Sequence, residues 1–157
     1  MLINTRDFGE IEVQEEKIIH FPYGIIAFEE MKRFFIIESG QEDLPFCWLQ
    51  SVDEGDLAFV LLNPFLFKKD YELEIPDGVV KELEIEKEEE VAVFSVIVVP
   101  EDINKITANL LAPIIINTKS FKGKQIILNN NKKYTTKHYI LEELKKVKGA
   151  VQDACAK

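Results

Sequence analysis

The sequence contains few of the residues from which catalytic and metal sites are usually built. Among its 157 residues are two histidines, His20 and His138, and two cysteines, Cys47 and Cys155. Two cysteines cannot form a disulfide framework or provide the four ligands of a structural zinc site, and these two are not spaced as a Cys-x-x-Cys pair. We therefore expect no metal centre and no cofactor.

Other signatures of catalysis are missing as well. None of the four serines lies in a Gly-x-Ser-x-Gly turn, and no glycine-rich phosphate-binding motif occurs. His20 ends an apolar segment beside Phe21, where a packed and hydrogen-bonded histidine is expected rather than a general base. The sequence therefore predicts no catalytic residue, although its many carboxylates leave a hydrolase with a carboxylate pair as an alternative.

Long hydrophobic runs and an excess of positive charge are also absent. The longest nearly unbroken apolar run, residues 91–99, is too short to cross a bilayer, and the first residues lack the apolar core of a signal peptide. The net charge is −9, which disfavours direct binding of nucleic acid because that affinity comes from Lys and Arg. We expect a cytoplasmic protein that binds neither nucleic acid nor membranes.

What the sequence does contain is a series of short segments typical of β-strands. Hydrophobic residues make up 46% and charged residues 30% of the chain, as in ordinary globular proteins, and the length suits one domain. Apolar or alternating segments bounded by turn residues predict strands at residues 2–5, 11–13, 18–21, 33–38, 46–50, 57–62, 71–75, 91–99, 114–117 and 125–128. The prediction is a mainly β protein, either a small antiparallel β-barrel or a strongly folded β-sheet, with one or two short helices and a C-terminal helix.

Two helices are expected. Residues 77–83 follow Pro76 and would be capped by Asp77. The second helix begins near Thr136, and its apolar stripe consists of Ile140, Leu144, Val147, Val151 and Ala154. We predict a single β domain over residues 1–140 and a helical C-terminal extension over residues 141–157, which covers the barrel, pairs with another copy or imitates a partner's helix.

Three turns are unusually apolar for loops. Residues 21–28, 63–67 and 108–114 combine Pro, Gly or Asn with large apolar side chains, where polar residues are usual. They either plug the barrel or leave an apolar patch of the kind that binds proteins. The predicted apolar partner-binding residues are Phe21, Pro22, Tyr23, Phe28, Phe65, Asn109, Leu110, Leu111 and Pro113.

Charge is distributed unevenly along the chain. Residues 1–100 carry 8 basic and 23 acidic side chains, whereas residues 101–157 carry 11 and 5. The two halves interleave in a β fold, so the acids either form a face that attracts a basic partner or simply solvate loops and edge strands. The predicted acidic partner-binding residues are Asp53, Glu54, Asp56, Glu82, Glu84, Glu86, Glu88, Glu89 and Glu90.

These segments and their neighbours resemble the flagellar assembly factor FliW family. The matching pieces follow one another in the family's order over roughly residues 3 to 134. They include Phe21-Pro22-x-Gly24-Ile25-x-x-Phe28-Glu29, Pro45-Phe46-x-Trp48-Leu49-Gln50-Ser51 and Ala108-Asn109-Leu110-Leu111-Ala112-Pro113-Ile114. Each piece alone is weak, and the pieces are specific together, with the last two at the separation expected for the family. The tail beyond Leu144 falls outside the resemblance.

The resemblance implies a non-enzymatic partner switch that assists flagellum assembly. Proteins similar to this one bind newly made flagellin at its C-terminal helical region and also bind CsrA, a small basic repressor of flagellin translation. Binding of CsrA relieves the repression, and accumulating flagellin releases CsrA again. We expect a protein that is a monomer on its own; a small-molecule-binding β-barrel protein and a hydrolase with a carboxylate pair are the alternatives.

Overall fold

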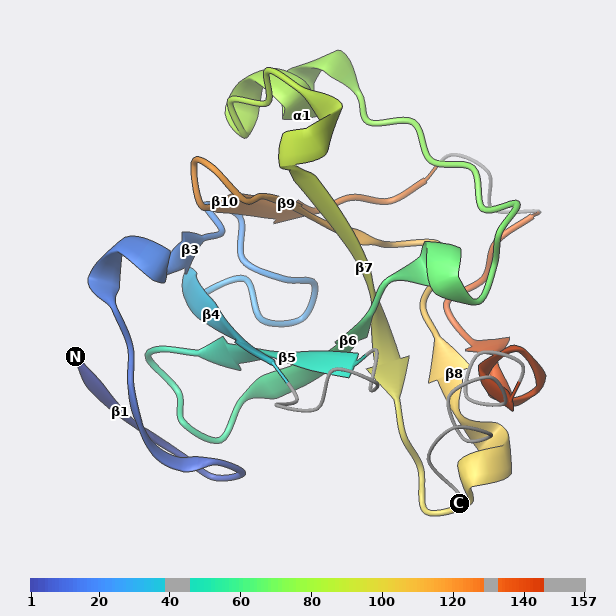
Figure 1. The fold of residues 1–157 in the computed structure, drawn as a ribbon, viewed down its shortest axis with the longest axis horizontal. Helices are drawn as coiled ribbons and strands as arrows, with labels where there is room; N and C mark the ends of the chain where they lie inside the picture. Colours follow the sequence, from blue (N-terminus) through green and yellow to red (C-terminus); the bar gives the residue numbers. More distant parts are fainter. Residues whose placement is uncertain (39–45, 129–132, 146–157) are drawn as a thin grey trace, which may run out of the picture.

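The computed structural model describes residues 1–38, 46–128 and 133–145 (Figure 1). Within these residues eleven strands, one short α-helix and four 3-10 helices are assigned, and residues 141–145 are also helical. The elements are β1 (Leu2–Thr5), β2 (Gly9–Glu12), η1 (Glu15–Lys17), β3 (Ile19–His20), β4 (Arg33–Glu38), β5 (Phe46–Ser51), β6 (Ala58–Leu62), η2 (Pro64–Leu66), α1 (Asp77–Glu82), η3 (Glu88–Glu90), β7 (Val91–Val98), η4 (Ile103–Lys105), β8 (Thr107–Ala108), β9 (Ile114–Asn117), β10 (Lys122–Gln125) and β11 (His138–Tyr139).

The main sheet closes on itself through strand β7. One edge of β7 pairs with β6, and on the other edge its first half, from Val91 to Phe94, pairs with β9 while its second half pairs with β8. The strand order β7-β6-β5-β4-β3-β10-β9 therefore returns to β7 and forms a seven-stranded barrel. The pairs are antiparallel except for β10 and β3. The prediction of a mainly β protein with a small barrel is confirmed.

The inside of the barrel is filled by side chains. Phe21, Phe34, Leu49, Leu61 and Ile114 are fully buried there, and the rings of Phe21 and Phe34 meet edge to face with their centroids 5.3 Å apart. Aromatic and aliphatic side chains from alternate positions of neighbouring strands fill a small barrel in this way. The barrel interior is therefore a core packed with side chains.

A second core lies beyond the barrel, where β8, β11 and residues 141–145 cover one end of β7 (Figure 1). Tyr71 and Tyr134 meet there with ring centroids 4.7 Å apart. The Tyr71 hydroxyl donates to the carbonyl oxygen of Leu110 over 2.6 Å, and the Tyr134 hydroxyl accepts from the backbone N–H of Glu72, also over 2.6 Å. Both tyrosine hydroxyls are thus satisfied although the rings are buried.

Two of the predicted strands differ most from the structure. Residues 71–75 bury Tyr71 and expose Glu72 and Glu74 as their alternation predicts, but the segment pairs with no described strand. Alternation reports which side chains face the core, and it does not ensure a neighbouring strand. The predicted last strand, residues 125–128, shares only Gln125 with β10 (Lys122–Gln125), whose residues pair with β9.

The helices also differ in detail. Helix α1 forms where predicted, but its N-cap residue is Pro76 and no side chain caps it, so the assignment of Asp77 as the cap is wrong. The second helix does not begin near Thr136, since His138 and Tyr139 form the edge strand β11. Ile140 and Leu144 are buried as their spacing predicts, whereas Val147, Val151 and Ala154 lie outside the described residues.

Candidate partner-binding surfaces

The turn after β3 is anchored by Phe21 and shaped by Gly24. Phe21 is fully buried in the barrel, and its carbonyl oxygen accepts a hydrogen bond from the backbone N–H of Gly24 over 2.9 Å. Gly24 has a φ of +66°, and a Cβ at this position would lie 2.5 Å from the Cα of Glu29. Only glycine fits such a left-handed, crowded position, so the path of the turn is set by these two residues.

The same turn holds three apolar side chains in solvent. Tyr23 is 58%, Ile26 50% and Phe28 41% exposed. The Phe28 ring rests edge to face on Phe59 with the centroids 5.5 Å apart, and the backbone N–H of Ile26 donates to Oε1 of Gln125 over 2.9 Å. Because the turn is fixed by the core below it, these side chains are presented in one arrangement. The sequence predicted Tyr23, Phe28 and the exposed Pro22 as contact residues.

The other predicted apolar turns are less open. At η2, Phe65 is 40% exposed, and the backbone N–H of Phe65 donates a hydrogen bond to the side chain of Asn63. In the turn before β9, Leu110 and Pro113 are buried, whereas Asn109 and Leu111 are half-buried. Oδ1 of Asn109 accepts from the backbone N–H of Ala112, which folds the turn onto the protein.

Three predicted contact residues are therefore core residues. Phe21, Leu110 and Pro113 have almost no surface to offer a partner, since turns rich in apolar residues pack inward when a neighbouring core has room for them. The exposed apolar surface predicted from three turns is reduced to the turn after β3 and to η2.

The acidic segment between α1 and β7 is interleaved with lysines from the β9–β10 hairpin. Three ion pairs connect them: Lys124 with Glu82 at 2.8 Å, Lys122 with Glu84 at 3.2 Å, and Lys119 with Glu90 at 3.9 Å. The sheet thus mixes the acidic and basic halves of the sequence. Glu86, Glu88 and Glu89 form no ion pair with any described residue, so they carry the remaining negative charge of this segment.

The other acidic residues lie in the turn between β5 and β6, at a different end of the molecule from α1 (Figure 1). Asp53 forms an ion pair with Arg33 at 2.5 Å, and the hydrogen bonds from this guanidinium hold the pKa of the Asp53 carboxyl below its usual value. Glu54 and Asp56 are exposed beside it. The structure therefore separates the predicted acidic residues into two groups.

Lys124 joins the apolar turn to the acidic segment. Its Nζ lies 4.5 Å from the centroid of the Tyr23 ring, a cation–π contact, and 2.8 Å from Oε2 of Glu82. Two segments about 60 residues apart in the sequence are adjacent through this one side chain. Sequence reasoning missed Lys124, because the pairing of β10 with its neighbours is what brings it between the two.

Further exposed apolar side chains were not predicted as contacts. Val98 and Tyr139 are 58% and 63% exposed, and both pair with Thr107 of β8, one on each side. Val99 and Ile103 follow in the chain and are also exposed. The apolar run of residues 91–99 did not predict this exposure. An apolar sequence does not indicate where other strands stop covering it.

The described residues do not gather the groups of a catalytic or metal site. Within them, no group of three or more His, Cys, Asp or Glu side chains is placed to hold a metal ion. Burial raises the pKa of the Cys47 thiol to about 11, which makes it a poor nucleophile. His20 is exposed and not packed as predicted. None of the helices built by the described residues has both the length and the apolarity to span a bilayer.

Fold and surface together define a small, closed β-barrel protein that presents fixed apolar and acidic surfaces. Comparisons with known proteins identify its family. The model of the FliW protein family matches residues 2–140. The chain is 50% identical to the flagellar assembly factor FliW of Alkaliphilus metalliredigens over 94% of this chain and 90% of that protein, and 44% identical to that of Treponema denticola, covering 92% and 96%.

A solved structure agrees with the sequence relatives. The crystal structure of a flagellar assembly factor FliW superposes with a TM-score of 0.82 and 39% sequence identity, covering 89% of this chain and 96% of that one. The chain belongs to the FliW family of flagellar assembly factors. This confirms the resemblance seen in the sequence and the expectation of a non-enzymatic assembly factor.

Proposed function

We propose that this protein is a cytoplasmic partner switch that binds flagellin, at its C-terminal helical region, and the translational repressor CsrA. In this proposal the free protein removes CsrA from the flagellin message, and flagellin that accumulates before export displaces CsrA. The family assignment supports a role in flagellum assembly, and the two partners follow from the family resemblance.

The observation that carries the proposal is the contact of the two predicted surfaces at Lys124. Tyr23, Ile26 and Phe28 form an apolar surface suited to the apolar face of an amphipathic helix. Glu86, Glu88 and Glu89, which form no ion pair with any described residue, are suited to a basic protein and would repel the phosphates of a competing RNA. Because Lys124 touches Tyr23 and Glu82, occupation of one surface would alter the other.

Binding of purified flagellin and purified CsrA tests the proposal. The unchanged protein is expected to co-elute with each partner separately on a sizing column, and flagellin is expected to displace CsrA. The double variant Tyr23→Ser/Ile26→Ser should lose flagellin, since each side chain exposes about half of its surface and contributes through burial on binding. The matched control is Leu2→Ser, which removes a side chain 62% exposed on the separate β1–β2 hairpin.

The acidic surface is tested by salt and by charge. Glu88→Gln/Glu89→Gln should weaken CsrA binding, and the affinity of the unchanged protein should fall as salt rises, because exposed charges are screened. Glu10→Gln/Glu12→Gln, on the β1–β2 hairpin, makes the same change of charge elsewhere and should leave the affinity unchanged. Separate elution of all three proteins would overturn the proposal.

A further inference from the structure

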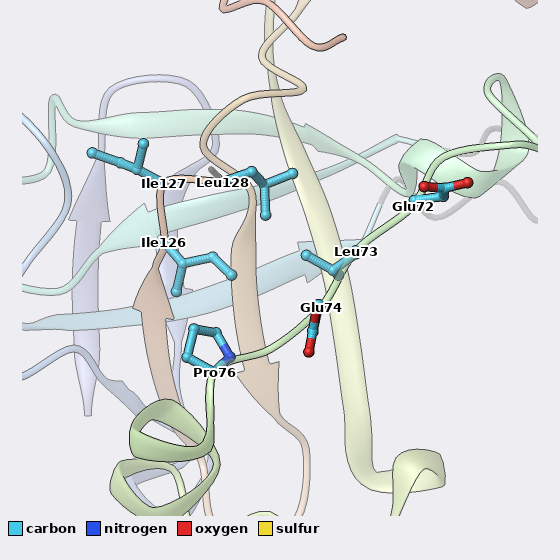
Figure 2. Close-up of a pocket in the computed structure, with 7 residues that line it drawn as sticks. All are labelled: Glu72, Leu73, Glu74, Pro76, Ile126, Ile127 and Leu128. Atoms are coloured by element: carbon cyan, nitrogen blue, oxygen red, sulfur yellow. The ribbon is translucent and has the colours of Figure 1, made fainter. Parts of the chain in front are cut away.

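A groove lies outside the two proposed surfaces. Residues 72–76 form one side of it, and residues 126–128, which follow β10 in the chain, form the other. Figure 2 shows Leu73, Ile126 and Leu128 directed toward the space between the two segments. The groove has a volume of about 480 Å³, and its lining residues are Glu72, Leu73, Glu74, Pro76, Ile126, Ile127 and Leu128. Its floor is apolar, since Leu73 and Leu128 pack onto the buried residues of the core beneath α1.

The backbone on both sides of this groove has unused hydrogen-bonding groups. Ile126 and Leu128 donate their N–H groups to the carbonyl oxygens of Pro113 and Leu111. Ile127, between them, makes no backbone hydrogen bond with any described residue, as expected for the residue whose N–H and C=O point away from the paired edge. Across the groove, the N–H and C=O groups of residues 73–75 are also unpaired among the described residues.

The unpaired segment is nevertheless held in an extended form. At one end, the N–H of Glu72 donates to the Tyr134 hydroxyl; at the other, the carbonyl oxygen of Pro76 accepts from the N–H groups of Val79 and Val80 in α1. Residues 71–75 have the alternating pattern of a strand, but no strand formed by the described residues pairs with them. An extended segment fixed at both ends loses little conformational entropy when another chain pairs with it.

The groove also carries negative charge on one side. Glu72 and Glu74 are both exposed. Glu72 has Lys133 at 3.4 Å, whereas Glu74 forms no ion pair with a described residue. A cross-strand Lys or Arg would complement Glu74, whereas a second copy of this chain, with a net charge of −9, would be repelled.

We propose that this groove binds an extended segment of a partner protein in which apolar and basic residues alternate. The apolar side chains fill the floor beside Leu73, the basic ones face Glu74, and the backbone pairs with the unused groups, as in β-strand addition. A helical occupant satisfies its own backbone and would leave those groups unpaired. The proposal goes beyond the two surfaces above and does not depend on them.

Fluorescence anisotropy with the labelled peptide Val-Lys-Val-Lys-Val-Lys-Val and the full-length protein tests this. This peptide should bind. A peptide with Glu in place of every Lys, and a peptide in which every second valine is N-methylated, should both bind at least tenfold more weakly. Glu74→Lys should weaken binding about tenfold, and Glu10→Lys, with the same change of charge on β2, less than twofold.

A backbone variant separates strand pairing from apolar contact. Ile127→Pro removes one unpaired N–H and should weaken binding at least fivefold, whereas Ile127→Ala keeps the N–H and should weaken it less than twofold, since the side chain is 65% exposed. Thermal unfolding of each variant verifies that it is folded. Absence of peptide binding, or equal binding by Ile127→Pro and Ile127→Ala, would overturn the proposal.

Two other occupants give different results. Dimerisation in sedimentation velocity that Ile127→Pro abolishes would assign the groove to a second copy. Peptide binding that appears only in the full-length variant Lys146→Glu/Lys148→Glu would assign it to the chain's own C-terminal segment. Either result would contradict the proposal.

Discussion

The packing of Phe21 against Gly123 gives the sharpest test of the barrel core. Gly123 is buried in β10, and a Cβ there would lie 2.5 Å from Cζ and 2.7 Å from Cε2 of Phe21. The Phe21 ring is fully buried and already packs on Phe34, so it cannot move aside freely. Gly123→Ala therefore overpacks the core, which we expect to cost about 1–3 kcal/mol of the free energy of unfolding.

The measurement is urea unfolding, monitored by the fluorescence of Trp48. This residue of β5 is the only tryptophan of the sequence, and its ring packs against Phe8. For a protein of this size, the same cost lowers the melting temperature by about 2–12 °C. Gly78→Ala is the matched control, because a Cβ at Gly78 meets nothing within 4 Å. That change, in α1, should stabilise the protein by about 0.5–1 kcal/mol.

A double variant shows whether Phe21 is the cause. Phe21→Leu shortens the side chain that the new methyl group would meet, so Phe21→Leu/Gly123→Ala should be less destabilised than the sum of the single variants, with an interaction energy of about 0.5–3 kcal/mol. The reasoning is wrong if the free energy of unfolding of Gly123→Ala lies within about 0.5 kcal/mol of that of the unchanged protein, or if the effects of the two changes are additive. In either case the Phe21 ring would not be what resists a larger side chain at position 123.

Two further predictions concern buried polar groups. Tyr71→Phe removes the 2.6 Å hydrogen bond to the Leu110 carbonyl and should lower the free energy of unfolding in urea by about 1–2 kcal/mol. The control Tyr139→Phe changes a ring that is 63% exposed and should alter the stability by less than about 0.5 kcal/mol. Equal effects of the two changes would contradict this prediction. In a Cys155→Ser background, the Cys47 thiol should react with a disulfide reagent at pH 8 about a hundredfold more slowly in the folded protein than in urea, because burial raises its pKa from 9.0 to about 11 and only the thiolate reacts. Equal rates in the two states would contradict the burial of this thiol.

Much of the fold could be predicted because it depends on local patterns. The segment Arg33–Glu38 was predicted as a strand with the bounds it has in the structure, since its apolar and β-branched or aromatic residues lie between polar loops. The helix after Pro76 follows from the fixed φ of proline, which suits the start of a helix. These signals are contained in a few neighbouring residues.

The candidate surfaces could be predicted only in part, because exposure depends on what the rest of the chain covers. Tyr23 and Phe28 were predicted as exposed and are, but Leu110, in an equally apolar turn, is 1% exposed. The glutamates of residues 82–90 were predicted, and their lysine partners were not, because those lysines come from a hairpin that lies about 30 to 40 residues later in the sequence. The groove escaped prediction for the same reason.

The sequence by itself determined that this is a mainly β protein without a predicted catalytic site, and its motifs indicated the family, because composition, alternation and turn residues act locally. Only the tertiary structure decided that Phe21 fills the barrel while Tyr23, two residues later, stays in solvent, and that Lys124 lies between Tyr23 and Glu82. The physical reason is that closing seven strands into a barrel sets which side chains share the limited interior and which charges become neighbours.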